Sequence, residues 1–322
     1  IAMELPDSAL RVVQSIDPES VRGRHDRAHY KLVVAEAHYY NRLAVDRDTI
    51  AQPLFDYYIG SDNHAERARA LYQHALVMQA EGENARAMFS LLEAEKSLTH
   101  LDNPRLSGLV HRTKGHIYGA ECLHKNALEE YQKSVSFFED ANLQEHSLYS
   151  KYLVAYSYAE LRNFDTAIKL FQDLEREVVE AKNYLLQNDI LCRLCFVYIE
   201  LNDFIRCAEA YNRFKEFSDN TMYQYYCIGA ILNAYNGNFE QSNILYSCAE
   251  KESISNPTLL KYTKCQILIH KGEFHKALNT YIECIDLQDK FVFNALNNSL
   301  LQSQVDLLSG QVASAKEIQQ KT

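Results

Sequence analysis

The sequence predicts an all-α protein, a right-handed superhelical solenoid of antiparallel helix hairpins. Two observations support this fold class. Only 10 Gly and 5 Pro interrupt the 322 residues, and Ala, Leu, Glu, Lys and Gln, which lose little conformational freedom in a helix, are frequent. A pattern of small and aromatic residues also recurs along most of the chain. No stretch alternates like a β-strand between hairpin dipeptides, so helix is expected throughout.

The recurring pattern joins one small residue to a second small residue twelve positions later. An aromatic or apolar residue follows the first by three positions and the second by four. The pairs are Ala75 with Ala87, Gly115 with Ala127, Ala155 with Ala167, Cys195 with Cys207, Ala230 with Ser242, Cys265 with Ala277 and Ser303 with Ala315. Their second members follow one another at intervals of 40, 40, 40, 35, 35 and 38 residues. This regularity predicts tandem helical hairpins.

Each part of the pattern has a packing role in such a hairpin. Small residues are required where two helices cross closely, and the large residues beside them fill the space between adjacent hairpins. The residues expected to fill this space are Tyr118, Tyr158 and Tyr198 from first helices, and Leu91, Tyr131, Phe171, Tyr211, Tyr246 and Tyr281 from second helices. Gly and Asn in the turns, such as Gly82, Asn163 and Asn202, are expected to supply the left-handed conformation that ends a first helix. The residues expected to begin second helices by packing back under the hairpin are Phe164, Phe204, Phe239 and Phe274.

These residues resemble the tetratricopeptide repeat, whose unit of about 34 residues has the same order of small and aromatic positions. The resemblance covers residues 64–322, in about seven repeats. It departs from the family in the absence of Trp and in the longer early intervals. The last repeat, from about Asn294, is degenerate or a cap, with Asp306 where an aromatic residue is expected.

Residues 1–63 are predicted to form an irregular N-terminal helical hairpin region. A short helix is expected to start at Pro6 and to end at Asp17-Pro18, followed by helices over residues 24–42 and 46–58. The opening Asp-Ser-Ala-Leu and the later Asp-Thr-Ile resemble the N-terminal region of tetratricopeptide proteins of Bacteroides-type bacteria. That resemblance implies a lipoprotein signal before the repeats and a membrane-tethered regulator.

Charge and hydropathy argue against two classes of partner. The net charge is −10 and the pI about 5.7, whereas nucleic-acid-binding domains usually carry a basic surface, so no nucleic acid is expected. No apolar run approaches the roughly 18 residues of a membrane span, so this segment is not expected to insert directly into a membrane. The localisation is left open between cytoplasmic and, if an upstream lipoprotein signal was removed, periplasmic or membrane-anchored. The oligomeric state is also left open.

The side chains that could carry chemistry do not form a recognised motif. His25 and His29 have the spacing of metal ligands on a helix but no third ligand beside them, so no metal is expected. Cys192 and Cys195 fall within one helix, and Cys195 and Cys207 occupy small positions of a hairpin, so reduced, packed thiols are predicted. No cofactor motif is present, and the chain is predicted not to be an enzyme.

The candidate site is the concave groove, because the first helices of a solenoid line that face. The candidate groove residues are Tyr72, Arg112, His116, Tyr149, Tyr152, Tyr156, Arg193, Phe196, Ile231 and Tyr262. Tyr149, Tyr152, Tyr156 and Phe196 are expected to lie together, bordered by Arg112, His116 and Arg193. Tyr beside Arg is the composition of an interaction hot spot. The alternative, that these rings only pack between helices, stays open.

The function that follows is a non-enzymatic scaffold that binds a protein or peptide partner. The narrower resemblance would make it the sensing part of a membrane-tethered bacterial regulator. Three alternatives remain: a sensor of a small molecule or signalling peptide in the groove, an enzyme with an unrecognised catalytic cluster, and an assembly component whose groove is filled by a second copy.

Overall fold

The computed structural model describes residues 5–217, 223–252, 257–285, 305–310 and 312. Every regular element in these ranges is a helix and none of them contains a strand, which confirms the all-α prediction. The chain folds into two compact units. The first unit comprises residues 1–120, 129–144 and 297–322, and the second comprises residues 121–128 and 145–296.

The N-terminal part of the first unit contains three α-helices, a 3-10 helix and a π-helical turn. Its elements are α1 (Pro6–Gln14), the 3-10 helix η1 (Pro18–Ser20), α2 (Arg24–Tyr40), the π-helical turn η2 (Arg47–Ala51) and α3 (Gln52–Tyr58). The carboxylate of Asp46 accepts a hydrogen bond from the Thr49 N–H at 2.7 Å and so caps η2. Leu32, Leu54 and Tyr58 form a small core between α2 and α3, and all three are fully buried.

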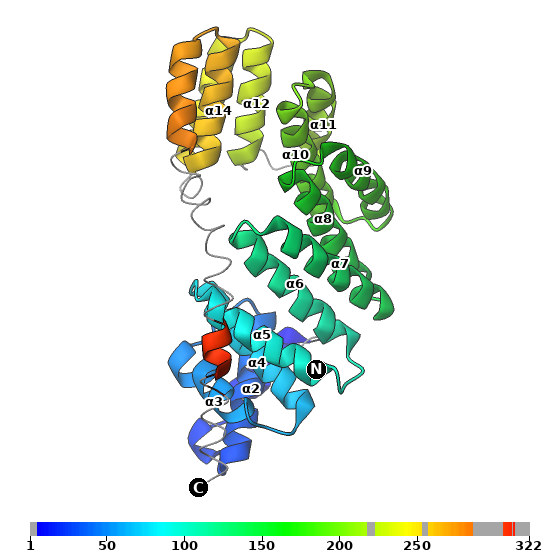
Figure 1. The fold of residues 1–322 in the computed structure, drawn as a ribbon, viewed down its shortest axis with the longest axis vertical. Helices are drawn as coiled ribbons and strands as arrows, with labels where there is room; N and C mark the ends of the chain where they lie inside the picture. The colour runs from blue at the N-terminus through cyan, green and yellow to red at the C-terminus, as the bar shows by residue number, and fades with distance from the viewer. Residues whose placement is uncertain (1–4, 218–222, 253–256, 286–304, 311, 313–322) are drawn as a thin grey trace. The chain divides into compact units, whose positions relative to one another are not determined.

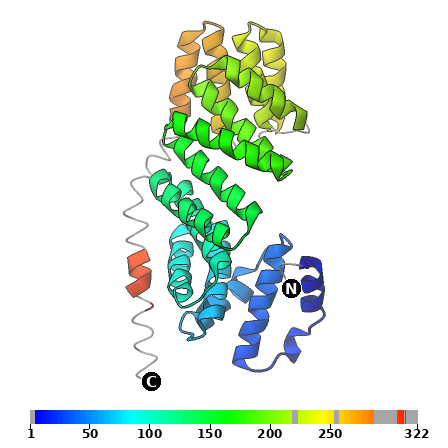
Figure 2. The same ribbon diagram turned by 90° about the vertical axis from the view of Figure 1, so that its right-hand side faces the viewer.

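Regular hairpins begin at α4. The helices that follow are α4 (His64–Ala80), α5 (Asn84–Leu98), α6 (Pro104–Ala120), α7 (His124–Asp140), α8 (Gln144–Glu160), α9 (Phe164–Glu180), α10 (Tyr184–Glu200), α11 (Phe204–Phe217), α12 (Tyr223–Tyr235), α13 (Phe239–Glu252) and α14 (Pro257–His270). Residues 274–285 form one more helix, antiparallel to α14. Figures 1 and 2 show the paired helices within each unit.

The predicted small pairs mark the helix crossings. Ala75 and Ala87 are both fully buried in the core of the first unit. In the second unit, the Ser242 hydroxyl donates a hydrogen bond to the Ala230 carbonyl at 2.8 Å, and the Cys195 thiol donates to the Cys207 carbonyl at 3.8 Å. A side chain that reaches the backbone of its partner helix requires a close approach of the two helices, and only a small residue permits that approach.

The turns follow the prediction in part. Gly82 and Asn202 have φ of 77° and 55°, in the left-handed region as expected. The prediction for Asn163 is wrong, because Arg162 adopts the left-handed conformation, with φ 59°. Asn163 instead caps α9 by accepting a hydrogen bond from the Thr166 N–H at 3.4 Å. The amide side chain is therefore used at the start of the second helix and not at the end of the first.

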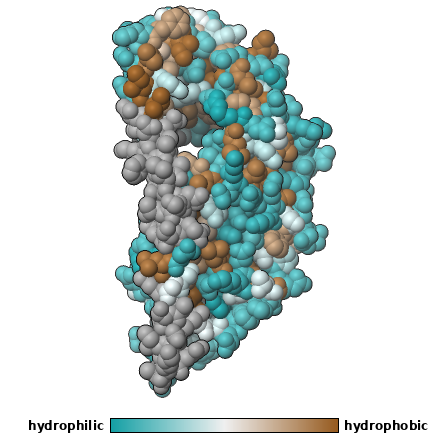
Figure 3. Space-filling model, in the orientation of Figure 1, coloured by the Kyte–Doolittle hydropathy of each residue, from teal (hydrophilic) through white to brown (hydrophobic). Residues whose placement is uncertain are grey.

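Two aromatic residues expected to be packed are exposed. Leu91, Tyr131 and Phe171 are buried as predicted, but Phe274 is 68% exposed and Tyr281 is 52% exposed. Both belong to the helix over residues 274–285, whose outer face is not covered by any helix in the described ranges. Figure 3 shows hydrophobic surface over this last described hairpin.

The C-terminal segment contributes to the first unit. Val305 is 3% exposed and packs in the same core as Leu106 and Phe138, and residues 305–310 form a short helix near α5 (Figures 1 and 2). Ser303 and Ala315, the small pair of the predicted last repeat, lie outside the described residues. The expected division of the chain at residue 63 stays a prediction.

Candidate partner-binding site

Helix α8 presents a ladder of three tyrosines on one face. Tyr149, Tyr152 and Tyr156 are spaced three and four residues apart, which places them one above another along the helix. The ring centroids of Tyr149 and Tyr152 are 6.0 Å apart with an interplanar angle of 22°. Those of Tyr152 and Tyr156 are 6.4 Å apart at 24°. The sequence spacing alone therefore produces an ordered row of nearly parallel rings.

Arg193 of α10 joins this ladder to the neighbouring hairpin. Its guanidinium lies 4.2 Å from the centroid of the Tyr156 ring and interacts electrostatically with the Tyr152 hydroxyl. Burial raises the pKa of Asp189, four residues earlier on α10, and the charge of Arg193 opposes that rise, so these two side chains interact electrostatically. Burial raises the pKa of Tyr152 to about 12, so its hydroxyl is neutral and does not cancel the charge of Arg193. We call Tyr149, Tyr152, Tyr156 and Arg193 the tyrosine–arginine cluster.

The cluster is partly core and partly surface. Tyr152 is 9% exposed and packs against Phe171 with the ring centroids 5.9 Å apart. Tyr149 is 37% exposed, and Tyr156, Arg193 and Phe196 are half-buried. One buried ring thus holds exposed rings and a cation in fixed positions, and little side-chain freedom would be lost when a partner binds.

Cys192 lies one residue before Arg193 but is not a nucleophile. Burial raises the pKa of its thiol to about 12, so the reactive thiolate is scarcely populated at neutral pH. All eight cysteines fall within the described part of the chain and are free thiols. Cys192, Cys195 and Cys207 are buried, as predicted, and their reduced state stays a prediction.

The other predicted groove residues differ in exposure. Tyr72 is 3% exposed and Ile231 is fully buried, so each offers little or no surface to a partner, while Tyr262 is half-buried on α14. Arg112 and His116 belong to the first unit. The expectation that these two border the tyrosine–arginine cluster stays a prediction.

Arg112 and His116 have partners within the first unit. Arg112 lies 5.1 Å from the centroid of the Phe138 ring. His116 Nδ1 and the Tyr131 hydroxyl are hydrogen-bonded at 3.1 Å. Burial, with the charge of Arg112, lowers the pKa of His116 to about 4. His116 is therefore neutral at physiological pH.

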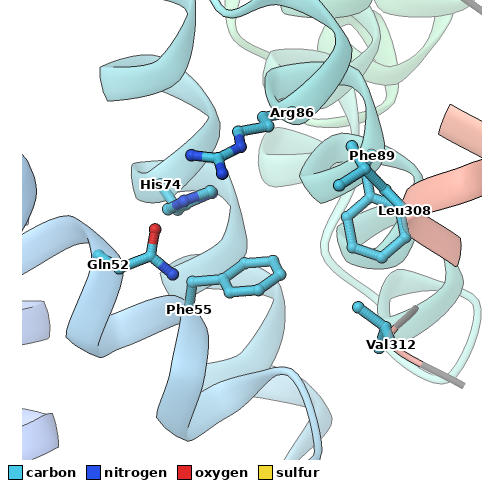
Figure 4. A pocket seen from close by; sticks show the side chains of 7 residues that line it. All are labelled: Gln52, Phe55, His74, Arg86, Phe89, Leu308 and Val312. Carbon is cyan, nitrogen blue, oxygen red and sulfur yellow. The ribbon is translucent and has the colours of Figure 1, made fainter. Parts of the chain in front are cut away.

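Sequence reasoning missed three cavities lined by described residues of the first unit, one of which, of about 160 Å³, lies between α2, α4 and α6. Of the other two, the smaller, of about 150 Å³, is lined by Gln52, Phe55, His74, Arg86, Phe89, Leu308 and Val312. Figure 4 shows Leu308 and Val312 of the C-terminal segment on the side opposite His74. The larger, of about 650 Å³, lies between the ends of α5 and α7 and the start of α6. Each draws residues from segments far apart in the sequence, so no local motif signals it.

The described helices contain no metal site and no membrane span. No group of three or more His, Cys, Asp or Glu is placed to hold a metal ion in the described ranges. None of the described helices combines the length and the apolar character needed to cross a bilayer.

The family model of the soluble NSF attachment protein, SNAP, matches residues 55–244, which is more than half of the chain. The chain belongs to the soluble NSF attachment protein family. The match includes α4 to α12 and all of the tyrosine–arginine cluster. No curated protein sequence matches the chain.

Several solved structures share the fold at low sequence identity. A Rap protein complexed with competence and sporulation factor has a TM-score of 0.65 and 9% identity, over 99% of this chain and 90% of that one. NprR in complex with its cognate peptide NprX has a TM-score of 0.61 and 12% identity, over 97% and 94%. Aspartyl phosphate phosphatase F from Bacillus subtilis has a TM-score of 0.60 and 11% identity, over 97% and 88%. At these identities the likeness concerns the fold.

Proposed function

We propose that this protein is a non-enzymatic binding module that holds a segment of a protein or peptide partner at the tyrosine–arginine cluster. The observation that carries the proposal is the stacked row Tyr149–Tyr152–Tyr156 with the guanidinium of Arg193 over its last ring. Tyr and Arg dominate the energetics of protein interfaces because they combine a large contact area with directed polar groups.

The chemistry of the cluster indicates what kind of segment fits. The exposed ring of Tyr149 and the half-buried ring of Phe196 would pack against apolar or aromatic anchors of the partner. Arg193, whose charge interacts with Asp189 on the same helix, would also pair with an acidic group of the partner segment. The tyrosine–arginine cluster therefore fits a partner segment that has an aromatic or aliphatic anchor beside an acidic group.

The comparisons agree with a binding role. The family is named for attachment to another protein, NSF, and two proteins of the same fold are complexed with a named factor or a cognate peptide. A third is named a phosphatase. The absence of enzyme activity is proposed here because the cluster consists of phenols and a guanidinium, and burial keeps the thiol of the neighbouring Cys192 protonated. These groups lack a paired nucleophile and base.

A signalling-peptide sensor is the alternative within the same site. The NprR complex with its peptide supports it, since that protein covers nearly all of this chain in the fold comparison. A short peptide seated among Tyr152, Tyr156 and Phe196 would use the same rings and the same cation as a partner segment. The size of the bound species separates the two functions.

The test combines capture with a matched pair of variants. Affinity capture from a detergent-solubilised lysate of the source organism identifies the bound species, which is then purified and titrated. Tyr149→Ala/Arg193→Gln should weaken its binding by about 2 kcal/mol or more, or roughly thirtyfold in Kd. The control is Tyr184→Ala/Arg176→Gln, which removes an exposed tyrosine and an exposed arginine of the same unit away from the cluster.

Each outcome has a defined meaning. A protein lost only by the first variant supports the scaffold, and a short peptide lost only by that variant supports the sensor. Equal affinity for both variants, with thermal melts matching the wild type, would show that the cluster only packs the two hairpins together.

The narrower proposal is that this is the sensing part of a membrane-tethered bacterial regulator. It rests on the Asp-Ser-Ala-Leu string at residues 7–10 and on Asp-Thr-Ile at residues 48–50. The tether predicts that the native protein sediments with membranes and that only detergent releases it. Recovery in the high-speed supernatant without detergent would contradict the tether but leave the binding module intact.

A further inference from the structure

A cavity of about 650 Å³ lies in the first unit, apart from the tyrosine–arginine cluster. It is enclosed by the C-terminal turn of α5, the connection that follows, the first turns of α6 and the last turn of α7. This volume falls within the range of about 300–1,000 Å³ of sites for organic ligands. A single ion would not fill it.

The wall of the cavity is apolar. Leu98, Leu101 and Val110 line it, and Phe137 contributes an aromatic ring. Phe137 is held in place by parallel stacking on His111, with ring centroids 5.2 Å apart and an interplanar angle of 8°. A ligand that enters therefore meets a fixed hydrophobic surface.

Next to the cavity, the lining residues His111 and Glu95 belong to a network of paired charges. His111 is 5% exposed and donates from Nδ1 to Glu130 Oε2 at 2.7 Å. The Lys114 ammonium bridges Glu130 Oε2 at 3.0 Å and Glu95 Oε2 at 2.8 Å, and Lys133 contacts the other oxygen of Glu130 at 2.9 Å. The carboxylates of Glu95 and Glu130 are thus balanced by the ammonium groups of Lys114 and Lys133. These four side chains leave no net negative charge for a ligand to neutralise.

The rim, by contrast, carries two carboxylates without partners. Asp102 and Asp140 line the cavity and are exposed. Neither makes a hydrogen bond or an ion pair from its side chain with another residue of the described ranges, and no Lys or Arg lines the cavity. The C-terminal ends of α5 and α7 contribute negative potential at the cavity, and the N-terminus of α6, whose first turn also lines it, contributes positive potential.

We propose that this cavity binds an organic cation, with a guanidinium or ammonium group between Asp102 and Asp140 and an aliphatic stem against Leu98, Val110 and Phe137. The apolar wall selects a cation that has a hydrocarbon body. A bare metal ion is the poorer fit, because no metal-binding group of three or more His, Cys, Asp or Glu is found in the described ranges. The cation can be a free amine or guanidine, or a Lys or Arg side chain of a peptide.

Matched probes test the charge requirement directly. Isothermal titration of the full chain with butylguanidinium should give saturable binding that weakens as salt rises. Butylurea, its neutral isostere, should not bind measurably. The ring resonances of His111 should shift on addition of butylguanidinium only, since the stacked His111 and Phe137 form the inner wall.

Two variants locate the site. Asp102→Asn/Asp140→Asn should weaken butylguanidinium binding about tenfold or more, because a hydrogen-bonded charge pair is lost. Both side chains are exposed and unpaired in the described structure, so the fold should tolerate the change. The control, Asp62→Asn/Glu129→Gln, removes the same charge from exposed positions of the same unit that do not line the cavity.

A second pair of probes identifies the source of the cation. The blocked tripeptide alanyl-arginyl-leucine is compared with the same tripeptide carrying citrulline in place of arginine. Arginine-dependent binding at least tenfold tighter than that of butylguanidinium assigns the site to a peptide side chain, and tighter binding of butylguanidinium assigns it to a free small cation. The proposal is overturned if neither cation saturates, if the urea compounds bind equally well, or if the two double variants bind alike.

Discussion

Gly115 is a position where one methyl group should test the packing of α6. A Cβ placed on Gly115 would lie 2.4 Å from Cε1 and 2.6 Å from Cδ1 of the Tyr131 ring. That ring is 4% exposed, and its hydroxyl is hydrogen-bonded to His116. It cannot move aside without giving up packing or that hydrogen bond. Gly115→Ala should therefore overpack the crossing of α6 and α7.

The magnitude follows from two opposing effects. Replacing Gly by Ala within a helix stabilises it by about 1 kcal/mol. Forcing a methyl group into a close-packed contact costs about 1–3 kcal/mol. The net expectation for Gly115→Ala is a free energy of unfolding lower by about 1 kcal/mol.

Gly119 provides the matched control one turn later on the same helix. A Cβ there would meet only the Tyr131 hydroxyl, at 3.7 Å, which is ordinary contact. Gly119→Ala should therefore raise the free energy of unfolding by about 0.5–1 kcal/mol. The two identical substitutions are predicted to have opposite signs.

Guanidinium chloride unfolding followed by circular dichroism measures both variants. Tyr131→Leu in the Gly115→Ala background should recover part of the loss, with a coupling of about 1–2 kcal/mol in a double-mutant cycle. The reasoning is refuted if Gly115→Ala is as stable as Gly119→Ala, or if the cycle shows no coupling.

Two further predictions concern the turns and the buried histidines. Lys182 is exposed and has φ 54°, a left-handed conformation that is strained for any residue with a Cβ. Lys182→Gly should therefore raise the free energy of unfolding by about 0.5–1 kcal/mol in the same unfolding assay. Lys182→Ala keeps the Cβ and the strain, so it should not raise the free energy of unfolding. Burial lowers the pKa of His74 to about 4, and burial with the Arg112 charge does the same for His116. An unfolded histidine takes up a proton near pH 6.5, so the free energy of unfolding should fall by up to a few kcal/mol as pH drops from about 6.5 to 4. His116→Gln should flatten that decline when unfolding midpoints are compared across pH, and an unchanged slope would contradict it.

Several features of the fold could be predicted because they arise from local chemistry. The twelve-residue spacing of Cys195 and Cys207, and of Ala230 and Ser242, predicts a helix crossing at each pair. The structure confirms both crossings. The exposed aromatic residues could not be predicted in the same way. Phe274 and Tyr281 follow the repeat pattern, yet their burial depends on a neighbouring element outside their own hairpin.

The candidate site shows the same division. The spacing of Tyr149, Tyr152 and Tyr156 was enough to predict a row of rings, because three- and four-residue steps share one helix face. The position of Arg193 over Tyr156 depends on how α10 packs beside α8. Tyr149 and Ile231 were both predicted to line the groove, but Tyr149 is 37% exposed and Ile231 is fully buried.

The sequence by itself determined that the chain consists of helical hairpins and where those hairpins cross, because helix propensity, turn residues and small-residue spacing act over a few turns of chain. Only the tertiary structure decided which faces are covered and which charges remain unpaired. Asp102 and Asp140 are 38 residues apart and follow no motif. They line the same cavity because the ends of α5, α6 and α7 pack together there. No local sequence pattern predicts that packing.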